Sequence, residues 1–563
     1  MPLKSALKAG KSNLLIRKFD ELSSKRSVKL SVYTFSLIFF FALILFPPLM
    51  GIIENIKYTD IIMSEYDLVS RANFAILQSF IMALIVSTLD LIAALPLAWF
   101  IVRSKSRAAH FVDALVDIPF LMPTAALGYS SLLFWSSGHG LPSFFGLNSL
   151  VPPGFFLVLL LHFAFSYPVI VRVMVGELLS YREIYEVVAR TLGARPWTAV
   201  RTITLPLLKT GIIASFLLAF ARSLSETGAT VMVAGSWENG PIFLFRLMEM
   251  AETEMPTDIK NGILVYVSSI LLLTSIIIFF LISLLAPKIR FPIKRVFPSL
   301  EEKMSSPALV RLRNSSSLLI FLLIIILPSI FVAFPMVEAI IGGALGSALL
   351  GSGSWGDYWR SMLVSYGIGS LATLLNVVFG LPVAIIIARR KLGRVSLILR
   401  ALVNIPIIVP SIALGVSLRL FWERYAFAHD FFALLLSHAT ITYTYFVASM
   451  AAAIESIPPE LEDVASTLGA KPFTVFRRVV LPLIKYSVFS GAILVFTRAL
   501  GETGAAKAVA KSQDLWTLPV LLVNWINNKN IDYSQKALGA GLYMISSFII
   551  LLALRLIIEK GRK

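Results

Sequence analysis

The sequence predicts an all-α polytopic membrane protein with about 12 transmembrane helices, arranged as two parallel six-helix repeats. Three observations support this fold class. Of the 563 residues, 57% are hydrophobic and only 15% are charged, which is too little charge to cover a soluble protein of this length. Apolar runs such as 31–50 and 268–285 are long enough to cross a bilayer core. The two halves of the chain also repeat each other.

Twelve apolar segments follow one another along the chain. We expect spans at 31–53, 75–102, 111–136, 155–175, 209–235, 261–287, 318–341, 363–388, 397–422, 429–454, 485–510 and 536–558. The first span follows a basic segment without a small-residue cleavage site, so we interpret it as a retained helix and not a signal peptide. The predicted organisation is a basic tail (1–30), a first half (31–287), a proline-rich linker (288–317) and a second half (318–563).

The placement of charge sets the predicted orientation. The formal net charge is +18, and basic residues gather in the N-terminal tail and in the loops 103–110 and 389–394. The loops 54–71 and 249–258 are acidic. By the positive-inside rule the basic loops are cytoplasmic, so we expect both termini and the linker in the cytoplasm. This distribution fits membrane topology and argues against a nucleic-acid partner. The chain has no cysteine, which excludes disulfides and thiol chemistry.

The repeat is clearest around a basic segment between spans four and five. Residues 191–229 align without a gap to 467–505, with 19 identities in 39 positions. The same offset of 276 residues pairs His162 with His438, Gly193 with Gly469, Pro206 with Pro482, Arg222 with Arg498, and Glu226 with Glu502. Because each half has an even number of spans, the repeats share one orientation and are related by an axis along the membrane normal. A solute pathway would then lie between the halves.

The repeated segment is predicted to form a rigid cytoplasmic elbow in each half. Residues 182–192 have apolar spacing compatible with a helix. Gly193 stands where a left-handed C-cap is expected, and Pro196 suits the first turn of a second helix. We call residues 182–206 the first elbow and 458–482 the second elbow. The other interpretation is a plain surface loop copied by duplication, but the outer loops diverged in length while this segment kept every spacing.

The elbows resemble the EAA loop of type I ABC importer permeases. In the second elbow Asp463-Val464-Ala465 stands in the Glu-Ala-Ala place, and in the first elbow Val187-Val188-Ala189 does so, with Glu186 one residue earlier. The resemblance covers about 75–283 and 363–555 and implies that each elbow docks in a cleft of an ATPase subunit. The coupling residues it implies are Glu186, Ala189, Gly193, Ile203, Pro206, Asp463, Ala465, Gly469 and Pro482.

The resemblance also implies the partners. They are two copies of an ABC ATPase subunit, which carry ATP and Mg, and an extracytoplasmic solute-binding protein; the chain itself would be a multi-pass permease of the cell membrane without a cofactor. Residues 9–13 end like a phosphate-binding loop, but Ser5 stands where its first glycine should be and no strand precedes it. We therefore expect no ATPase site and no enzyme activity in this chain. Related permeases carry ferric iron, thiamine or oxyanions such as molybdate and sulfate, and the sequence does not choose among these solutes.

Charged residues within span five of each half are the candidate pathway residues. Arg222 and Glu226 are four residues apart, so they can pair on one helix face, and the repeat places Arg498 and Glu502 alike. Each acid is followed by Thr-Gly, and glycine permits close helix approach. These faces either line or gate the pathway, or they hold only a structural ion pair. The candidates are Arg222, Glu226, Thr227, Arg498, Glu502, Thr503, Asp90 and Asn376.

Asp90 and Asn376 occupy equivalent places in spans two and eight. Interhelical hydrogen bonding is the preferred interpretation and a proton relay is the alternative. Lys507 stands opposite Val231 of the first repeat and could add positive potential toward an anion. The five histidines show no metal-ligand spacing, so no metal site is predicted.

Two other classes of protein fit parts of the sequence. A secondary transporter with six-plus-six repeats would run on an ion gradient and need no ATPase, but it has no reason to keep a duplicated cytoplasmic elbow. An intramembrane enzyme would need a catalytic cluster, and none is evident. The permease of an ABC importer is therefore the favoured hypothesis.

Overall fold

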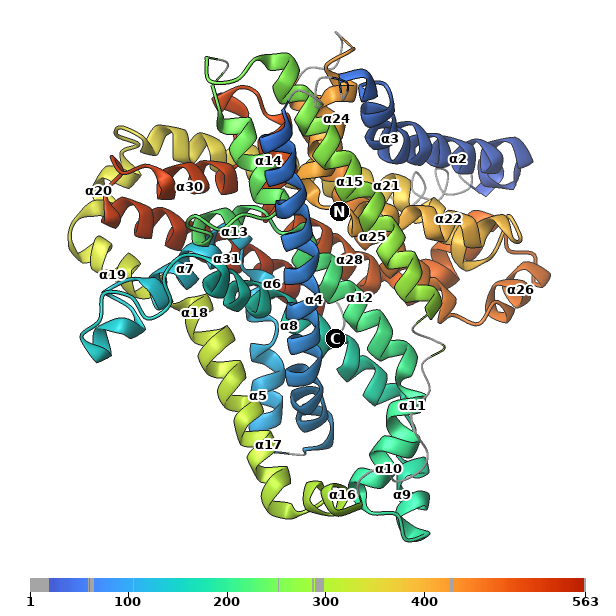
Figure 1. Cartoon of the computed structure of the whole chain (residues 1–563). Coiled ribbons are helices and arrows are strands. Elements are labelled where there is room, and N and C mark those ends of the chain that lie inside the picture. The colour runs from blue at the N-terminus through green and yellow to red at the C-terminus, as the bar shows by residue number, and fades with distance from the viewer. Residues whose placement is uncertain are drawn as a thin grey trace, which may run out of the picture.

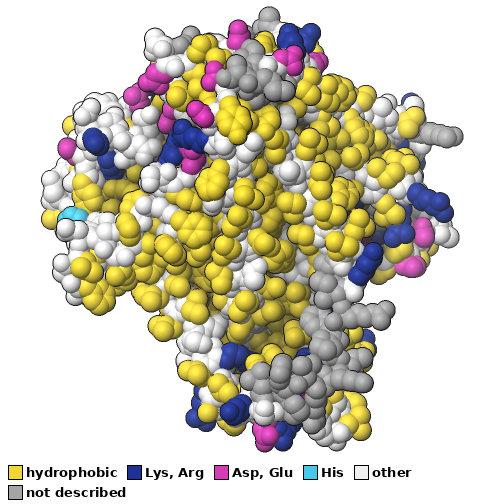
Figure 2. All heavy atoms as spheres, viewed as in Figure 1, with side chains coloured by type: hydrophobic (Ala, Val, Ile, Leu, Met, Phe, Trp, Pro, Cys, Tyr) yellow, Lys and Arg dark blue, Asp and Glu magenta, His cyan; other side chains and the backbone are white. Residues whose placement is uncertain are grey.

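The computed structural model describes residues 20–58, 60, 65–104, 106–251, 253–285, 288, 298–425 and 430–560. Within these ranges every regular element is a helix (Figure 1). Nine of the described helices are long and apolar enough to cross a membrane, and three bent pairs raise the number to 12. Figure 2 shows hydrophobic side chains over the middle of one face and most charged ones towards its margins, as expected of a chain surrounded by lipid.

The helices follow the predicted repeat. The first half contains α2 (Arg26–Phe39), η1 (Phe40–Leu45), α3 (Phe46–Ile53), α4 (Tyr66–Arg103), α5 (Arg107–Leu115), α6 (Ile118–Leu121), α7 (Thr124–Ser136), η3 (Leu141–Phe145), α8 (Phe155–Ser180), α9 (Ile184–Thr191), α10 (Pro196–Ala199), η4 (Val200–Thr204), α11 (Leu205–Leu207), α12 (Lys209–Ser225), α13 (Gly228–Val233), α14 (Gly240–Glu249) and α15 (Thr257–Leu285).

The second half follows a similar order. It contains α16 (Pro298–Met304), α17 (Pro307–Ile320), η6 (Phe321–Ile326), α18 (Leu327–Ile330), α19 (Ala333–Ile341), α20 (Ala344–Leu349), α21 (Trp355–Ala388), α22 (Val395–Val403), α23 (Ile405–Ile408), α24 (Ser411–Trp422), α25 (Asp430–Glu455), α26 (Glu460–Thr467), α27 (Pro472–Val475), η7 (Phe476–Val480), α28 (Leu481–Leu500), α29 (Gly504–Val509), η8 (Gln513–Leu515), α30 (Leu518–Asn527) and α31 (Tyr533–Lys560). Its first span begins at Pro307, inside the segment predicted as a linker.

The third and ninth spans are not straight. The segments predicted as spans at 111–136 and 397–422 are bent pairs of helices, which turn by 108° and 103° before α7 and α24. Met122 and Val409 are extended at the two bends. Each precedes a proline, which disfavours the helical conformation of the residue before it. The helices α7 and α24 that follow are almost wholly buried.

The fifth and eleventh spans also break where one helix was predicted. Helix α12 ends at Ser225 and α13 begins at Gly228. In the second half, α28 ends at Leu500 and α29 begins at Gly504. The breaks fall at the candidate pathway residues. Two further short helices, α14 and α30, lie in segments predicted as outer loops; both are mostly buried, and the first amide of each donates to a serine of α4 or α21 (2.8 and 2.7 Å).

The first spans of the two halves are exchanged. Helix α3 packs on α24 of the second half, and Phe40 stacks on Tyr443 with ring centroids 5.5 Å apart. In return α18 packs on α7 of the first half, and Phe321 stacks on Tyr167 at 6.2 Å. Helix α2 (blue in Figure 1) accordingly packs on α21, while α17 packs on α4 of the first half. Each half therefore holds the first helix of the other.

Candidate functional site

The two elbows have the same backbone geometry. Helices α9 and α26 each end in a glycine with positive φ, Gly193 at +91° and Gly469 at +85°. The amide after each glycine donates to the carbonyl of Ala189 or Ala465 at 3.0 Å, which closes a Schellman cap. A proline then opens the second helix of each elbow, as α10 and α27 show. The predicted caps are confirmed, and they turn each elbow at a fixed angle.

Each elbow presents an apolar face that the described residues of the chain leave uncovered. Leu192 and Leu468, equivalent residues, are both 83% exposed, and Val188 and Val464 are exposed beside them. Ala189 and Ala465 are half-buried. Of the other predicted coupling residues, Ile203 and Pro206 are half-buried in η4 and α11, and Pro482 is exposed at the start of α28. Exposed apolar residues at matched positions are typical of a protein-binding surface.

The acidic residues of the elbows do not all share this face. Glu186 lies 3.3 Å from Arg103, at the end of α4, and its equivalent Glu462 lies 2.7 Å from Arg389 at the end of α21. Burial raises the pKa of Glu186 above its usual value, and Arg103 acts against that rise. Asp463, by contrast, is exposed. The structure thus places Glu186 against its own half, where it ties the elbow to span two.

A brace behind the first elbow was missed by the sequence reasoning. Glu301 accepts a hydrogen bond from Thr198 (2.8 Å) and pairs with Arg201 (2.9 Å). Ser305 accepts from the amide of Trp197 (3.2 Å). These contacts hold the N-terminus of α10, whose orphan amides need acceptors. The bracing residues lie in the segment predicted as a linker.

The second elbow has an equivalent brace from the N-terminal segment. The amide of Phe473 donates to Ser23 (3.1 Å), and Thr474 donates to Asp20 (2.7 Å). A sequence signal for both braces exists, since an acid followed by two serines precedes the first span of each half, at 20–24 and 301–306. Because the first spans are exchanged, each brace supports the elbow of the other half.

The predicted charge pairs form where spans five and eleven break. Arg222 lies 3.0 Å from Glu226, and Arg498 lies 3.0 Å from Glu502. Each glutamate also accepts a hydrogen bond from the backbone amide of the residue three positions later, at 3.4 and 3.1 Å. The acids therefore neutralise the arginines and close the N-termini of α13 and α29 together. Both carboxylates are buried, as a paired intramembrane charge should be.

The two breaks meet each other between the halves. A Cβ atom added to Gly228 would lie 2.3 Å from Thr503 Oγ1, and one added to Gly504 would lie 2.9 Å from Thr227 Oγ1. The contact is reciprocal, as a pseudo-two-fold axis requires. Across the same interface the hydroxyl of Thr124 donates to the carbonyl of residue 501 at 2.8 Å. Six of the predicted pathway residues thus come together in one closed seam.

Asp90 and Asn376 lie elsewhere, each within its own half. Asp90 accepts a hydrogen bond from Ser166 of α8. Asn376 donates to the carbonyl of Ala439 (3.2 Å) and to Thr442 (2.8 Å), both in α25. The interhelical hydrogen bonds preferred from the sequence are present. Both residues are fully buried between helices, so the structure does not bring them into the seam.

The comparison with known families decides what kind of protein carries this seam. Residues 91–291 and 380–563 match the family described as "Binding-protein-dependent transport system inner membrane component". The two matches cover most of both halves. The chain belongs to this family. It is the permease subunit of an ABC importer and a multi-pass membrane protein, as the elbows predicted, and the comparison favours this identity over a secondary transporter.

Individual relatives of the permease correspond to one half of it. The molybdenum transport system permease protein ModB of Mycobacterium bovis is 29% identical over 39% of this chain and 88% of its own length. The sulfate transport system permease protein CysT of Salmonella typhimurium is 30% identical over 36% of the chain and 80% of its own length. The molybdate/tungstate transport system permease protein WtpB of Pyrococcus furiosus is 28% identical over 34% of the chain and 75% of its own length.

At the end of the permease away from the elbows, a polar cavity joins the two halves. Lys507 of α29 lies 3.3 Å from Glu249 of α14 and over the rings of Phe245 and Trp516, at 5.3 and 5.0 Å. The cavity of about 520 Å³ is lined by Met248, Glu249, Lys507, Asn524, Asn527 and Asn528. Lys507, which the sequence reasoning singled out without a partner, is therefore an inter-half residue.

The buried histidines of the permease have ordinary partners. His162 contacts the hydroxyls of Ser223 (2.8 Å) and Thr230 (2.9 Å), and His438 contacts the carbonyl of Leu434 (2.9 Å). Among the residues that the structure describes, no group of three or more histidine or acidic side chains is placed to hold a metal ion.

Proposed function

We propose that the permease forms the pathway for a tetrahedral oxyanion of the molybdate and sulfate class. An external binding protein delivers the anion, and two ATPase subunits, which bind ATP and Mg²⁺, dock on the elbows. The chain has no ATPase site of its own and both of its termini are cytoplasmic. The observation that carries the proposal is the pair of elbows, which share their caps, their braces and their uncovered leucine and valine residues.

The path from elbow to seam supports mechanical coupling. In the second half α27, η7 and α28 join into one continuous helix, which runs from Pro472 in the elbow to Leu500 beside the break. Its 29 residues span roughly 43 Å at 1.5 Å per residue. A displacement of the elbow by an ATPase subunit therefore reaches Glu502 and Thr503 through a rigid element. In the first half the corresponding helix bends by 70° at Leu208. A displacement of the first elbow therefore reaches the seam through a bent helix, and a displacement of the second elbow through a straight one.

An oxyanion is favoured by the relatives and by the polar cavity. The printed names of the relatives specify molybdenum, sulfate and molybdate or tungstate. In this chain Lys507 supplies an ammonium group to the cavity and three asparagines supply amide donors. The ammonium group is paired with Glu249. An arriving dianion would displace Glu249 from Lys507, because the two negative groups compete for one positive charge. Separation of α14 from α29 would accompany that exchange.

Transport in a reconstituted system tests the proposal. Proteoliposomes containing the permease, its ATPase subunits and the binding protein should take up molybdate or sulfate only with ATP. Hydrogen bonds to charged groups contribute about 1.5–3 kcal/mol, so Lys507→Gln should slow uptake by about tenfold or more. Lys511→Gln is the matched control, since Lys511 pairs with Glu423 away from the cavity. Uptake driven by an ion gradient without ATPase subunits would contradict the proposed mechanism.

A further inference from the structure

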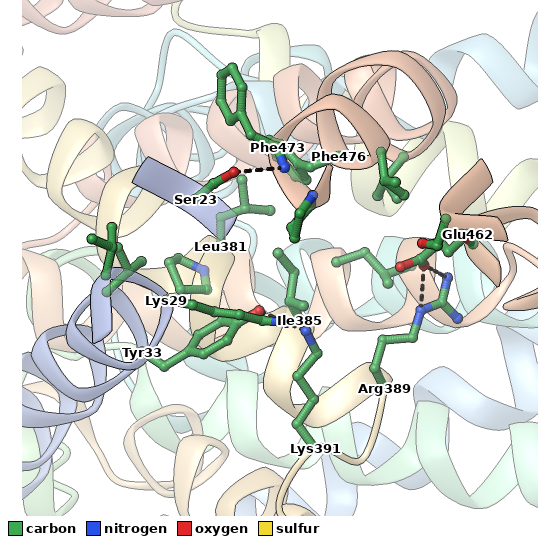
Figure 3. A pocket seen from close by; sticks show the side chains of 18 of the residues that line it. Ser23, Lys29, Tyr33, Leu381, Ile385, Arg389, Lys391, Glu462, Phe473 and Phe476 are labelled. Atoms are coloured by element: carbon green, nitrogen blue, oxygen red, sulfur yellow. Dashed lines mark hydrogen bonds and ion pairs between the residues drawn. The ribbon is translucent and has the colours of Figure 1, made fainter. Parts of the chain in front are cut away.

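A deep crevice lies between the exchanged first helix and the second elbow. Its volume is about 590 Å³, and its walls come from α2, α21, α26, α27 and η7 (Figure 3). One end is apolar and is lined by Val28, Val32, Val377, Val378, Leu381, Pro382 and Ile385. The other end is polar and charged, and it lies where α21 reaches the cytoplasmic loop. The crevice is therefore amphipathic along its length.

The polar end carries an excess of positive charge. Arg389 and Glu462 neutralise each other at 2.7 Å. Lys391 donates to the hydroxyl of Tyr33 at 2.7 Å and lies 4.9 Å from the centre of its ring, and Lys29 lines the same end (Figure 3). Beyond the neutral pair, the lining holds these two lysines against one acid, Asp463. This end favours an anion.

The apolar end opens to the surface that faces lipid. Val32 is 50% exposed and Val378 is 52% exposed, although both lie in helices that cross the membrane. From Val378 to Arg389 the helix rises about 16 Å at 1.5 Å per residue. A soluble anion has no use for an apolar groove of this length, whereas an acyl chain fits one.

We propose that this crevice binds an anionic phospholipid of the cytoplasmic leaflet. Its phosphate lies against Lys29 and Lys391, and one acyl chain lies between α2 and α21. Basic pockets between helices on the cytoplasmic side of a membrane are suited to anionic headgroups. The inference is independent of the solute and depends only on the elbows facing the cytoplasm.

The bound lipid touches the elbow directly. Phe473 and Phe476, in α27 and η7, line the crevice together with Asp463 of α26. Phe473 is also the residue whose amide is held by the brace at Ser23. A lipid in the crevice therefore contacts the elbow, α2 and Ser23 of the brace, so its presence sets how firmly the elbow is held.

The first elbow lacks the counterparts of Lys29 and Tyr33. The π-helices η1 and η6 start at Phe40 and Phe321, and this alignment places Val310 where Lys29 stands and Asn314 where Tyr33 stands. The proposal is thus one lipid site for each permease chain, at the second elbow.

Lipid binding to the intact complex of permease and ATPase subunits tests the proposal. After delipidation in detergent, native mass spectrometry with added phosphatidylglycerol should show one retained lipid that phosphatidylcholine does not replace. Each lysine near an anionic headgroup contributes about a fivefold gain in affinity, so the double change Lys29→Gln and Lys391→Gln should weaken phosphatidylglycerol by about 25-fold. Lys485→Gln, at an exposed lysine outside the crevice, should leave binding unchanged.

A second variant tests the apolar end and keeps the test decisive if the double lysine variant fails to fold. Val378→Trp fills the groove while both lysines stay, and it should also abolish retention. Unchanged phosphatidylglycerol binding in either variant, or equal displacement by free glycerol phosphate, would overturn the proposal. In nanodiscs, phosphatidylglycerol should alter ATP hydrolysis by the wild-type complex but not by either variant, and an equal response would refute the coupling to the elbow. No solute is present in these assays, so a failed solute proposal leaves their outcome unaffected.

Discussion

The ion pair at the break before α29 gives the sharpest test of the seam. Glu502 is 1% exposed, lies 3.0 Å from Arg498 and accepts the amide of Ala505 at 3.1 Å. Removing one partner of a buried pair costs about 3–5 kcal/mol, and losing a helix cap costs about 1 kcal/mol more. Glu502→Lys should therefore destabilise the permease by about 4–6 kcal/mol, against a typical total stability of about 5–15 kcal/mol.

A compensating change separates charge from capping. Adding Arg498→Glu restores opposite charges at the pair, but the lysine that replaces Glu502 cannot accept the amide of Ala505. The double variant should recover all but about 1–2 kcal/mol of the loss, the sum of the cap and the unfavourable charge at a helix N-terminus. Thermal unfolding of the purified complex and ATP-driven uptake in proteoliposomes measure both effects.

The matched control is an exposed pair of similar spacing. Asp357 and Arg360 pair in the outer part of α21, and both side chains are about half exposed. Asp357→Lys should cost about 0–1 kcal/mol and leave uptake intact. The reasoning would be refuted if Glu502→Lys unfolded at the wild-type temperature with normal uptake, or if the double variant were no better than the single one.

Two further predictions concern glycines. A side chain at Gly193 or Gly469 would meet no atom within 4 Å and costs only about 1–2 kcal/mol of backbone strain. Replacing both with Glu should leave the protein in the membrane but abolish uptake. Gly343→Glu, at a similar φ of +86° in an outer loop, should keep uptake. Uptake by the double variant would show that the elbows are not docking sites. Gly228→Ala would place its Cβ 2.3 Å from Thr503 Oγ1 and should separate the two breaks at the seam. ATP hydrolysis by this variant should then no longer need the binding protein. If hydrolysis by the Gly228→Ala complex still depended on the binding protein, that result would contradict a closed seam at this position.

Local features of the permease could be predicted from the sequence because their causes are local. A glycine after a short amphipathic helix and a proline three residues later require one conformation, and Gly193 and Gly469 adopt it. The number of spans follows from apolar length. The bends at Met122 and Val409 also have a local cause, the following proline, but apolar runs that continue through both bends conceal it from a reading of hydrophobicity.

The exchange of the first spans has no local cause. The ring of Phe40 would fit an aromatic partner in either half, and only the assembled structure places it on Tyr443. The braces follow from that exchange, since Ser23 can reach Phe473 only when the first helix lies on the second half. A sequence pattern specifies which face of a helix is apolar, but not which of two similar halves covers that face.

The fusion of two halves has a physical consequence near their common axis. In a dimer of identical subunits, every residue beside the axis occurs twice, so a lysine at position 507 would bring two positive charges towards one cavity and they would repel each other. In the fused chain Val231 takes the equivalent place, and the single lysine pairs with Glu249 from the other half. The lipid crevice is likewise asymmetric in the part of the chain that the structure describes, since Val310 and Asn314 stand where Lys29 and Tyr33 line it. Fusion therefore permits a single charge in the polar cavity between the halves, while the seam keeps the symmetry by which two opposed breaks contact each other.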